Sequence, residues 1–155
     1  MSTKFYYFWV PMKRLQQSLL LVLIICVQVC EAQVLAVYQY DGGGDWYANP
    51  TALKNLSNFY NKSTDAKSLV LSEPITAESL IVSGVSFLHA TGHGRIMLSE
   101  TQADQLRMFT ENGGFIHIDD NYGMSNYAKE ALEQVFPTAT IAPVSHDHAI
   151  FNSLF

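Results

Sequence analysis

Short apolar runs alternate with stretches of helical periodicity along most of this chain. The runs are rich in β-branched and aromatic residues, and turn residues follow them. The predicted strands span residues 34–40, 68–75, 86–91, 114–118 and 139–144. The predicted helices lie within residues 49–62, 98–114 and 125–136. This alternation predicts a single three-layer α/β domain, in which a mostly parallel sheet has helices on both faces.

The helix ends carry recognisable capping signals. Asn49 precedes a proline and is expected to be the N-cap of the first helix. Ser99 and Gln102 have the spacing of a capping box, which predicts the start of the second helix. Gly113 follows that helix and is expected to end it in a left-handed conformation.

The first 32 residues resemble a secretory leader. Lys13 and Arg14 precede an apolar run over residues 18–29, and Cys30 and Ala32 supply small residues before a cleavage site. The apolar run is shorter than the roughly 20 residues that a membrane-spanning helix needs. We therefore expect residues 1–32 to be a signal peptide and residues 33–155 to be exported, either periplasmic or secreted. A retained membrane anchor is the alternative, and Met12 is an alternative start.

Cysteine is confined to the predicted leader. Cys26 and Cys30 are the two cysteines of the chain, so the sequence from Gln33 onward has none. This excludes disulfides, thiolate metal sites and a cysteine nucleophile from the predicted domain.

The predicted domain is acidic. Removal of the leader leaves six lysines and arginines against thirteen aspartates and glutamates, a net charge of −7. The residues lost in this count are Lys4, Lys13, Arg14 and Glu31. Nucleic-acid binding needs clustered basic side chains, so no nucleic-acid partner is expected. No membrane partner is expected once the leader is removed.

Polar side chains follow several of the predicted strands at the point where each strand ends. Residues 41–45, His93, Asp119, Asp120 and residues 145–148 all occupy such positions. The carboxyl ends of parallel strands meet at one edge of a sheet, and ligands of open α/β sheets bind outside that edge. The sequence therefore predicts a shared site built from residues far apart in the chain.

Several motifs resemble those of a bacterial family known as domain of unknown function 4159. They are, in order along the chain, GGGDWYANPTALKNL, HATGHG, LRMFTENGGFIHIDDNYG and HDHAIFNSLF. The resemblance begins near Val34 and implies a flavodoxin-like sheet of the class I glutamine-amidotransferase-like superfamily. The family usually continues for further strands, so the resemblance implies a domain truncated at its carboxyl end.

The superfamily's amidotransferases carry a cysteine on a sharp strand-to-helix turn. The corresponding turn here is IDDNYG, which places Asp119 or Asp120 at that position. Because the predicted domain has no thiol, the resemblance does not imply amidotransferase chemistry.

Asp119 and Asp120 are the first candidate catalytic residues. Repulsion between two adjacent carboxylates raises the pKa of one of them. A carboxyl group with a raised pKa suits a general acid or a metal ligand. Adjacent side chains on a strand point to opposite faces, so both meet one ligand only if the strand has already turned. In the alternative interpretation Asp120 caps the next turn, and Asp119 pairs with a backbone amide or with Arg95.

His93 is the third candidate catalytic residue. It lies between Gly92 and Gly94, which allow the backbone to approach a ligand closely. The alternative is a strand-end histidine in a tight turn. His89 and His117 lie inside apolar strands and are expected to be core or interface histidines with their hydrogen bonds satisfied.

His146 and His148 are candidate metal ligands. Histidines two residues apart on an extended segment point the same way and can hold a divalent metal together with a carboxylate from elsewhere. The alternative is a polar loop in which Asp147 caps a short helix.

The DGGGDW turn and its surroundings are expected to contact a ligand. The turn lacks a P-loop lysine, yet it precedes a helix N-terminus, where an anion is favoured. Trp46 could stack on a sugar, or it could belong to the core. The expected ligand contacts are Gly43, Gly44, Asp45, Trp46, Gly92, Gly94 and Tyr122.

Two functions fit these observations. The first is a non-catalytic module that binds a small ligand, for instance a sugar, or that takes part in assembly. The alternative is a metal-assisted or acid/base hydrolase that uses Asp119 or Asp120 with His93, His146 and His148.

Overall fold

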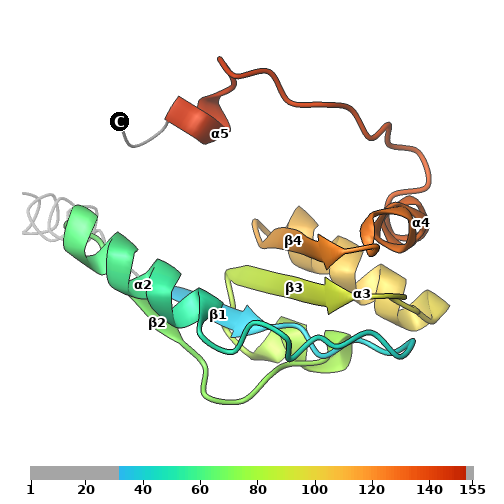
Figure 1. Ribbon diagram of the computed structural model, residues 1–155, viewed down its shortest axis with the longest axis horizontal. Helices are drawn as coiled ribbons and strands as arrows, with labels where there is room; N and C mark the ends of the chain where they lie inside the picture. Colours follow the sequence, from blue (N-terminus) through green and yellow to red (C-terminus); the bar gives the residue numbers. More distant parts are fainter. Residues whose placement is uncertain (1–31, 153–155) are drawn as a thin grey trace, which may run out of the picture. The chain divides into compact units, whose positions relative to one another are not determined.

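The computed structural model describes residues 32–152, and a four-stranded sheet forms the centre of this part (Figure 1). All strand pairs are parallel, and the strand order is β2-β1-β3-β4. The strands are β1 (Gln33–Val37), β2 (Ser68–Val70), β3 (Phe87–His93) and β4 (Phe115–Tyr122). The predicted α/β fold with a parallel sheet is therefore confirmed.

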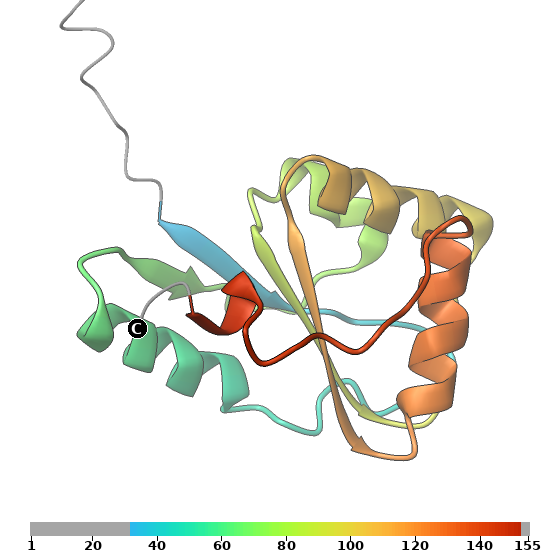
Figure 2. The same cartoon turned by 90° about the horizontal axis from the view of Figure 1, so that it is seen from above.

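Helices lie on both faces of the sheet, as Figure 2 shows. Leu35 and Phe87 face α2, whereas Ala90, Ile116 and Ile118 face α3 and α4. The helical elements are α2 (Ala52–Ser63), the 3-10 helix η1 (Ala77–Val82), α3 (Glu100–Glu111), α4 (Ser125–Val135) and α5 (Ala149–Asn152). No helix within residues 32–152 is long and apolar enough to cross a membrane.

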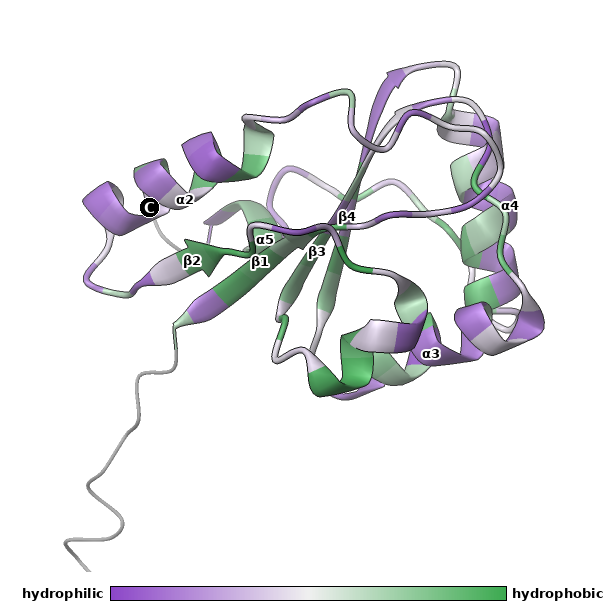
Figure 3. Ribbon diagram, turned by 90° about the horizontal axis from the view of Figure 1, so that it is seen from below, coloured by the Kyte–Doolittle hydropathy of each residue, from purple (hydrophilic) through white to green (hydrophobic). Residues whose placement is uncertain are grey.

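The core lies mainly between the sheet and the layer of η1, α3 and α4. β1 and β3 run through the middle of the sheet, and β1 is apolar along most of its length (Figure 3). Ala36 and Leu88 are neighbours across these two strands, and both are fully buried. Met124, just before α4, is also fully buried. Burial of these side chains provides the main stabilising free energy of the fold.

The predicted ends of α3 are confirmed. The Ser99 hydroxyl accepts a hydrogen bond from the Gln102 backbone, and the Gln102 side chain accepts one from the Ser99 N–H. Gly113 has φ +91°, and its N–H donates to Thr110. The Gly114 N–H donates to the carbonyl of Phe109, which completes a Schellman motif.

Three predicted elements have ends that differ from the structure, and the first of them is the predicted strand 34–40, which ends at Val37. The first helix begins at Ala52 with Thr51 at its N-cap, because the Asn49 side chain is engaged elsewhere. The predicted strand 68–75 ends at Val70, and Ile75 makes only an isolated bridge with Tyr38. The Ile75 N–H donates to the Val37 carbonyl at 2.8 Å, so pairing with β1 resumes at Ile75 after an interruption that contains Pro74.

The two strands that lead to the predicted site are longer than expected. β3 continues to His93, and β4 continues to Tyr122. Asp119 and Asp120 therefore lie within β4, where they pair with Thr91 and Gly92. Carboxylates are tolerated in this strand because β4 is an edge strand and this end of it is exposed.

The predicted strand 139–144 is absent from the described part of the chain. Residues 137–152 are exposed, and none of them joins the sheet. An apolar, β-branched segment becomes a strand only when a neighbour supplies its hydrogen bonds, and no strand of the described part pairs with this one.

Candidate functional site

The loops that follow β1 and β3 run alongside each other beyond the carboxyl edge of the sheet (Figure 1). The Met97 N–H donates to the Asp41 carbonyl at 2.8 Å, and Gly43 forms a bridge with Arg95. A Cβ on Gly42 would lie 2.7 Å from the Arg95 carbonyl oxygen. Glycine at this position therefore allows the two loops to approach each other.

Asp45 and His93 form a hydrogen-bonded pair across these loops. Asp45 Oδ2 lies 2.8 Å from His93 Nδ1, and Asp45 Oδ1 accepts the backbone N–H of His93. Two hydrogen bonds from His93 lower the pKa of Asp45 below its ordinary value. The bond from the backbone N–H has the larger effect, and the bond from the imidazole has the smaller one. An ionised carboxylate can only accept, so Nδ1 of His93 carries the hydrogen and Nε2 is an acceptor in the neutral ring.

The free edge of His93 is available to a ligand. Its side chain is 52% exposed, and within residues 32–152 its Nε2 makes no hydrogen bond. Asp45 therefore fixes the orientation of an imidazole whose other nitrogen faces outward for recognition or proton transfer.

Two of the predicted ligand-contacting glycines allow this pair to form. Gly92 has φ +131°, and a Cβ there would lie 2.7 Å from the Asp45 carbonyl oxygen and from its Oδ1. A Cβ on Gly44 would lie 2.6 Å from the Tyr40 ring and 2.8 Å from the His93 carbonyl oxygen. These glycines admit Asp45 and Tyr40 close to β3. Gly94 has φ +81°, and a Cβ there would meet only the Cα of Gly44, at 3.8 Å.

A polar network beneath the pair holds the loop after β1 against β3 and β4. The buried Tyr40 hydroxyl donates to the Thr91 carbonyl at 2.9 Å. Burial, and then the Asp45 charge, raises the pKa of Tyr40 to about 12. The Asn49 amide donates to Thr91 Oγ1 at 2.7 Å and to Asn121 Oδ1 at 2.8 Å.

Local sequence patterns do not predict this network. Asn49 is predicted to be a helix cap, and no pattern indicates a role for Tyr40, Thr91 or Asn121. An asparagine before a proline is also a turn signal, which is the one local hint that its side chain has another partner. The spatial neighbours of Asn49 are 42 and 72 residues away in the chain.

The structure brings Asp119 and Asp120 to the same edge as His93. Asp120 pairs with Gly92 in the sheet register, and His93 itself pairs with Tyr122. The two carboxylates have different surroundings, however. Asp120 accepts the backbone N–H groups of Met124 at 2.8 Å and Ser125 at 2.9 Å, which is the capping alternative. The Asp119 side chain makes no hydrogen bond or ion pair within the described residues.

Replacing Asp120 with alanine is expected to lower the free energy of unfolding by about 1–2 kcal/mol, because the first turn of α4 loses two hydrogen bonds to a carboxylate. Asp119→Ala is the matched control and is expected to change the same quantity by less than about 0.5 kcal/mol. Urea denaturation of both variants measures the difference. Equal losses would show that Asp120 does not stabilise α4.

His146 and His148 do not join this group. They lie in the exposed segment before α5, where the Asn152 amide donates to both of their carbonyl oxygens at 3.1 Å. His148 Nδ1 accepts the Ile150 N–H at 3.2 Å. Across residues 32–152, no three His, Cys, Asp or Glu side chains are placed to hold a metal ion together.

Aromatic side chains form one wall beside the carboxyl end of β1. Trp46 and Tyr47 pack edge to face at 5.3 Å, and Tyr47 is exposed. They line a cavity of about 170 Å³ together with Val37, Asn49, Pro50, Leu71, Ser72, Glu73 and Pro74. Tyr122, beside His93 in register, is also exposed. The edge therefore offers both aromatic surface and hydrogen-bonding groups.

His89 and His117 pair with each other across β3 and β4. Their Nδ1 atoms lie 3.0 Å apart, so one donates to the other. Desolvation of the buried ring lowers the pKa of His89, and the electrostatic effect of His117 lowers it further. The lowered pKa keeps the His89 ring neutral. His89 Nε2 has no partner within the described residues, so the expectation of a fully satisfied core histidine is wrong at this atom.

Comparison with known proteins agrees with the motifs. A family model described as "Domain of unknown function (DUF4159)" matches residues 34–155. No curated protein matches the chain.

Proposed function

We propose a small-ligand-binding function for this chain, which belongs to the DUF4159 family. The proposed site is the carboxyl edge of the sheet, and the observation that carries the proposal is the Asp45–His93 pair. The pair presents an oriented, exposed imidazole above a network of hydrogen bonds that joins the loop after β1 to β3 and β4. Such preorganisation reduces the ordering that a ligand must impose on the site.

The surroundings favour a neutral, hydroxyl-rich ligand such as a sugar. Asp41, Asp45 and Asp119 make this edge acidic, which disfavours anions. Tyr47 offers an exposed ring for stacking beside Trp46, which is partly buried against the core, and His93 Nε2 offers an acceptor for a hydroxyl.

Two finer statements belong to the same proposal. The scaffold is that of a glutamine-amidotransferase-like domain in which no cysteine nucleophile exists from Gln33 onward. The domain acts outside the cytoplasm, which rests on the leader-like sequence of residues 1–32.

An acid/base hydrolase is the second candidate. A carboxylate that holds Nδ1 of a histidine is the arrangement that orients a general base. Within residues 32–152, no hydroxyl side chain is hydrogen-bonded to His93, so water would be the nucleophile. His93 Nε2 would take a proton from that water as it attacks.

The test is a titration of the full chain with a panel of neutral mono- and disaccharides, followed by NMR of the histidine side chains and by calorimetry. His93→Gln is expected to weaken binding of any saccharide that binds by about fivefold to tenfold, because one hydrogen bond to the ligand is lost. His148→Gln is the matched control and is expected to leave the affinity unchanged.

Saccharides that perturb His117 but not His93, or no binding across the panel, would contradict the sugar-binding proposal. Release of reducing ends that disappears in His93→Gln would favour the hydrolase instead.

A further inference from the structure

One half of a sheet face is left without a helix. Phe115 and His117 lie on the side of β4 opposite Ile116 and Ile118, which pack toward α3 and α4. Phe115 is 43% exposed, and its ring stacks on Phe87 at 5.5 Å with an interplanar angle of 17°. The helix on this face, α2, contacts β1 and β2. A parallel sheet normally has both faces covered, so this surface lacks part of its layer.

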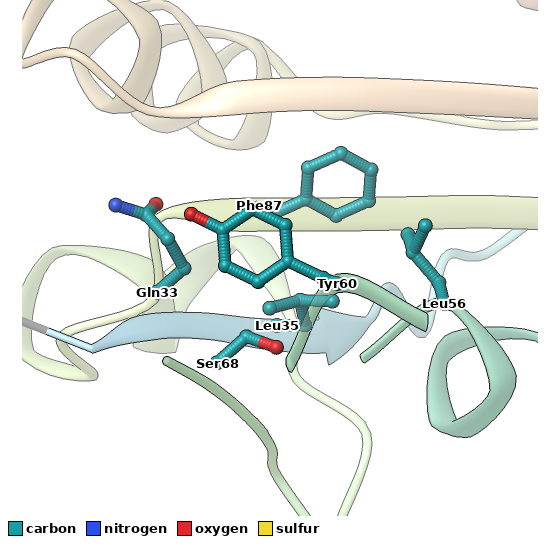
Figure 4. A pocket seen from close by; sticks show the side chains of 6 residues that line it. All are labelled: Gln33, Leu35, Leu56, Tyr60, Ser68 and Phe87. Carbon is teal, nitrogen blue, oxygen red and sulfur yellow. The ribbon is translucent and has the colours of Figure 1, made fainter. Parts of the chain in front are cut away.

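An apolar groove adjoins this surface at the amino ends of the strands. Its volume is about 330 Å³, and Figure 4 shows the side chains of α2 and of the strands that surround it. The lining residues are Gln33, Leu35, Leu56, Tyr60, Ser68 and Phe87. None of them is charged, so the groove fits an apolar occupant.

The segment after α4 carries the matching apolar side chains. Residues 137–152 are exposed, and α5 presents Ile150 and Phe151 at 49% and 61% exposure. Figure 2 shows this segment crossing over the sheet, so that α5 lies on the side of α2. In Figure 1 a space separates α5 from β3. Exposed apolar side chains that adjoin one another favour contact with another apolar surface.

We propose that α5 is the helix that covers this face, and that Ile150 and Phe151 dock in the groove beside α2 against Leu56 and Phe87. The linker over residues 138–148 spans up to about 35 Å when extended, which is enough to cross a small sheet. Its attachment gives α5 a high effective concentration at the groove, which a free partner lacks. The segment acts as a strap that closes the amino end of the sheet, away from the Asp45–His93 edge.

Cysteine trapping in the full chain tests the strap. In a Cys26→Ser/Cys30→Ser background, the pair Gln33→Cys/Asn152→Cys places one thiol at the groove and one on α5. The matched control, Met108→Cys/Asn152→Cys, places the first thiol on an exposed position of α3 on the opposite face. Under mild oxidation the groove pair is expected to form an intramolecular disulfide roughly tenfold faster than the control pair.

Non-reducing gels and mass spectrometry distinguish the outcomes. Adding Ile150→Ser/Phe151→Ser to the groove pair is expected to reduce its rate to that of the control. Equal rates for the two pairs, or no effect of the serine substitutions, would overturn docking by α5. Covalent dimers in place of monomeric disulfides would overturn it in favour of a second copy as the occupant.

Discussion

Replacing Gly92 with alanine is expected to lower the free energy of unfolding by about 3 kcal/mol and to separate Asp45 from His93. Gly92 has φ +131°, a conformation that side chains strain. The added Cβ would also lie 2.7 Å from Asp45 Oδ1 and 2.8 Å from the Tyr40 hydroxyl. Strain and overlap therefore act at one position, directly beneath the proposed site. Urea denaturation measures the stability, and NMR of the His93 ring reports on the pair.

Gly84→Ala is the control that separates strain from overlap. Gly84 has φ +70°, and a Cβ there would meet nothing within 4 Å. The free energy of unfolding of this variant is expected to fall by only about 1 kcal/mol, because backbone strain is the only destabilising effect of the added Cβ. If both variants lost the same amount, the close approach of Asp45 to Gly92 would have no energetic importance.

Replacing Leu88 with alanine is expected to lower the free energy of unfolding by about 2–5 kcal/mol. Leu88 is fully buried in β3, and its strand partners are Ala36 and Ile116. Neighbouring strands on both sides restrict the collapse of the cavity that the truncation leaves. Thermal and urea denaturation of the full chain measure the loss.

Leu69→Ala in the edge strand β2 is the matched control. Leu69 is 46% exposed. Its replacement by alanine is expected to lower the free energy of unfolding by less than about 1 kcal/mol, since the side chain is already partly in water. A loss at Leu88 no larger than that at Leu69 would mean that the central strand is not the core of the domain.

Local sequence was a good guide where neighbours in the chain make the structure. The α3 capping box joins residues three apart, and the end of that helix depends on Gly113 and the carbonyls just before it. Such hydrogen bonds form within one turn, so the pattern of residue types is sufficient to predict them. The parallel sheet was predictable for a related reason, because alternating strands and helices leave few other topologies.

Local sequence was a poor guide where a side chain or a segment has competing partners. Asn49 is of a residue type that is common at helix N-caps. Its side-chain amide nevertheless donates hydrogen bonds to Thr91 and Asn121 across the sheet edge. The segment 139–144 has the composition of a strand, yet no neighbouring strand of the described part pairs with it. In both cases distant groups determine the outcome, and their positions are unknown until the sheet is formed.

The residues by themselves determined the class of fold, the edge at which polar groups collect and the absence of a thiol from Gln33 onward. Only the tertiary structure decided which of those groups meet. It paired Asp45 with His93, directed Asp120 to the start of α4 and left His146 and His148 apart. The physical reason is that hydrogen bonds act over about 3 Å, whereas sequence patterns specify only which edge of the sheet a residue reaches.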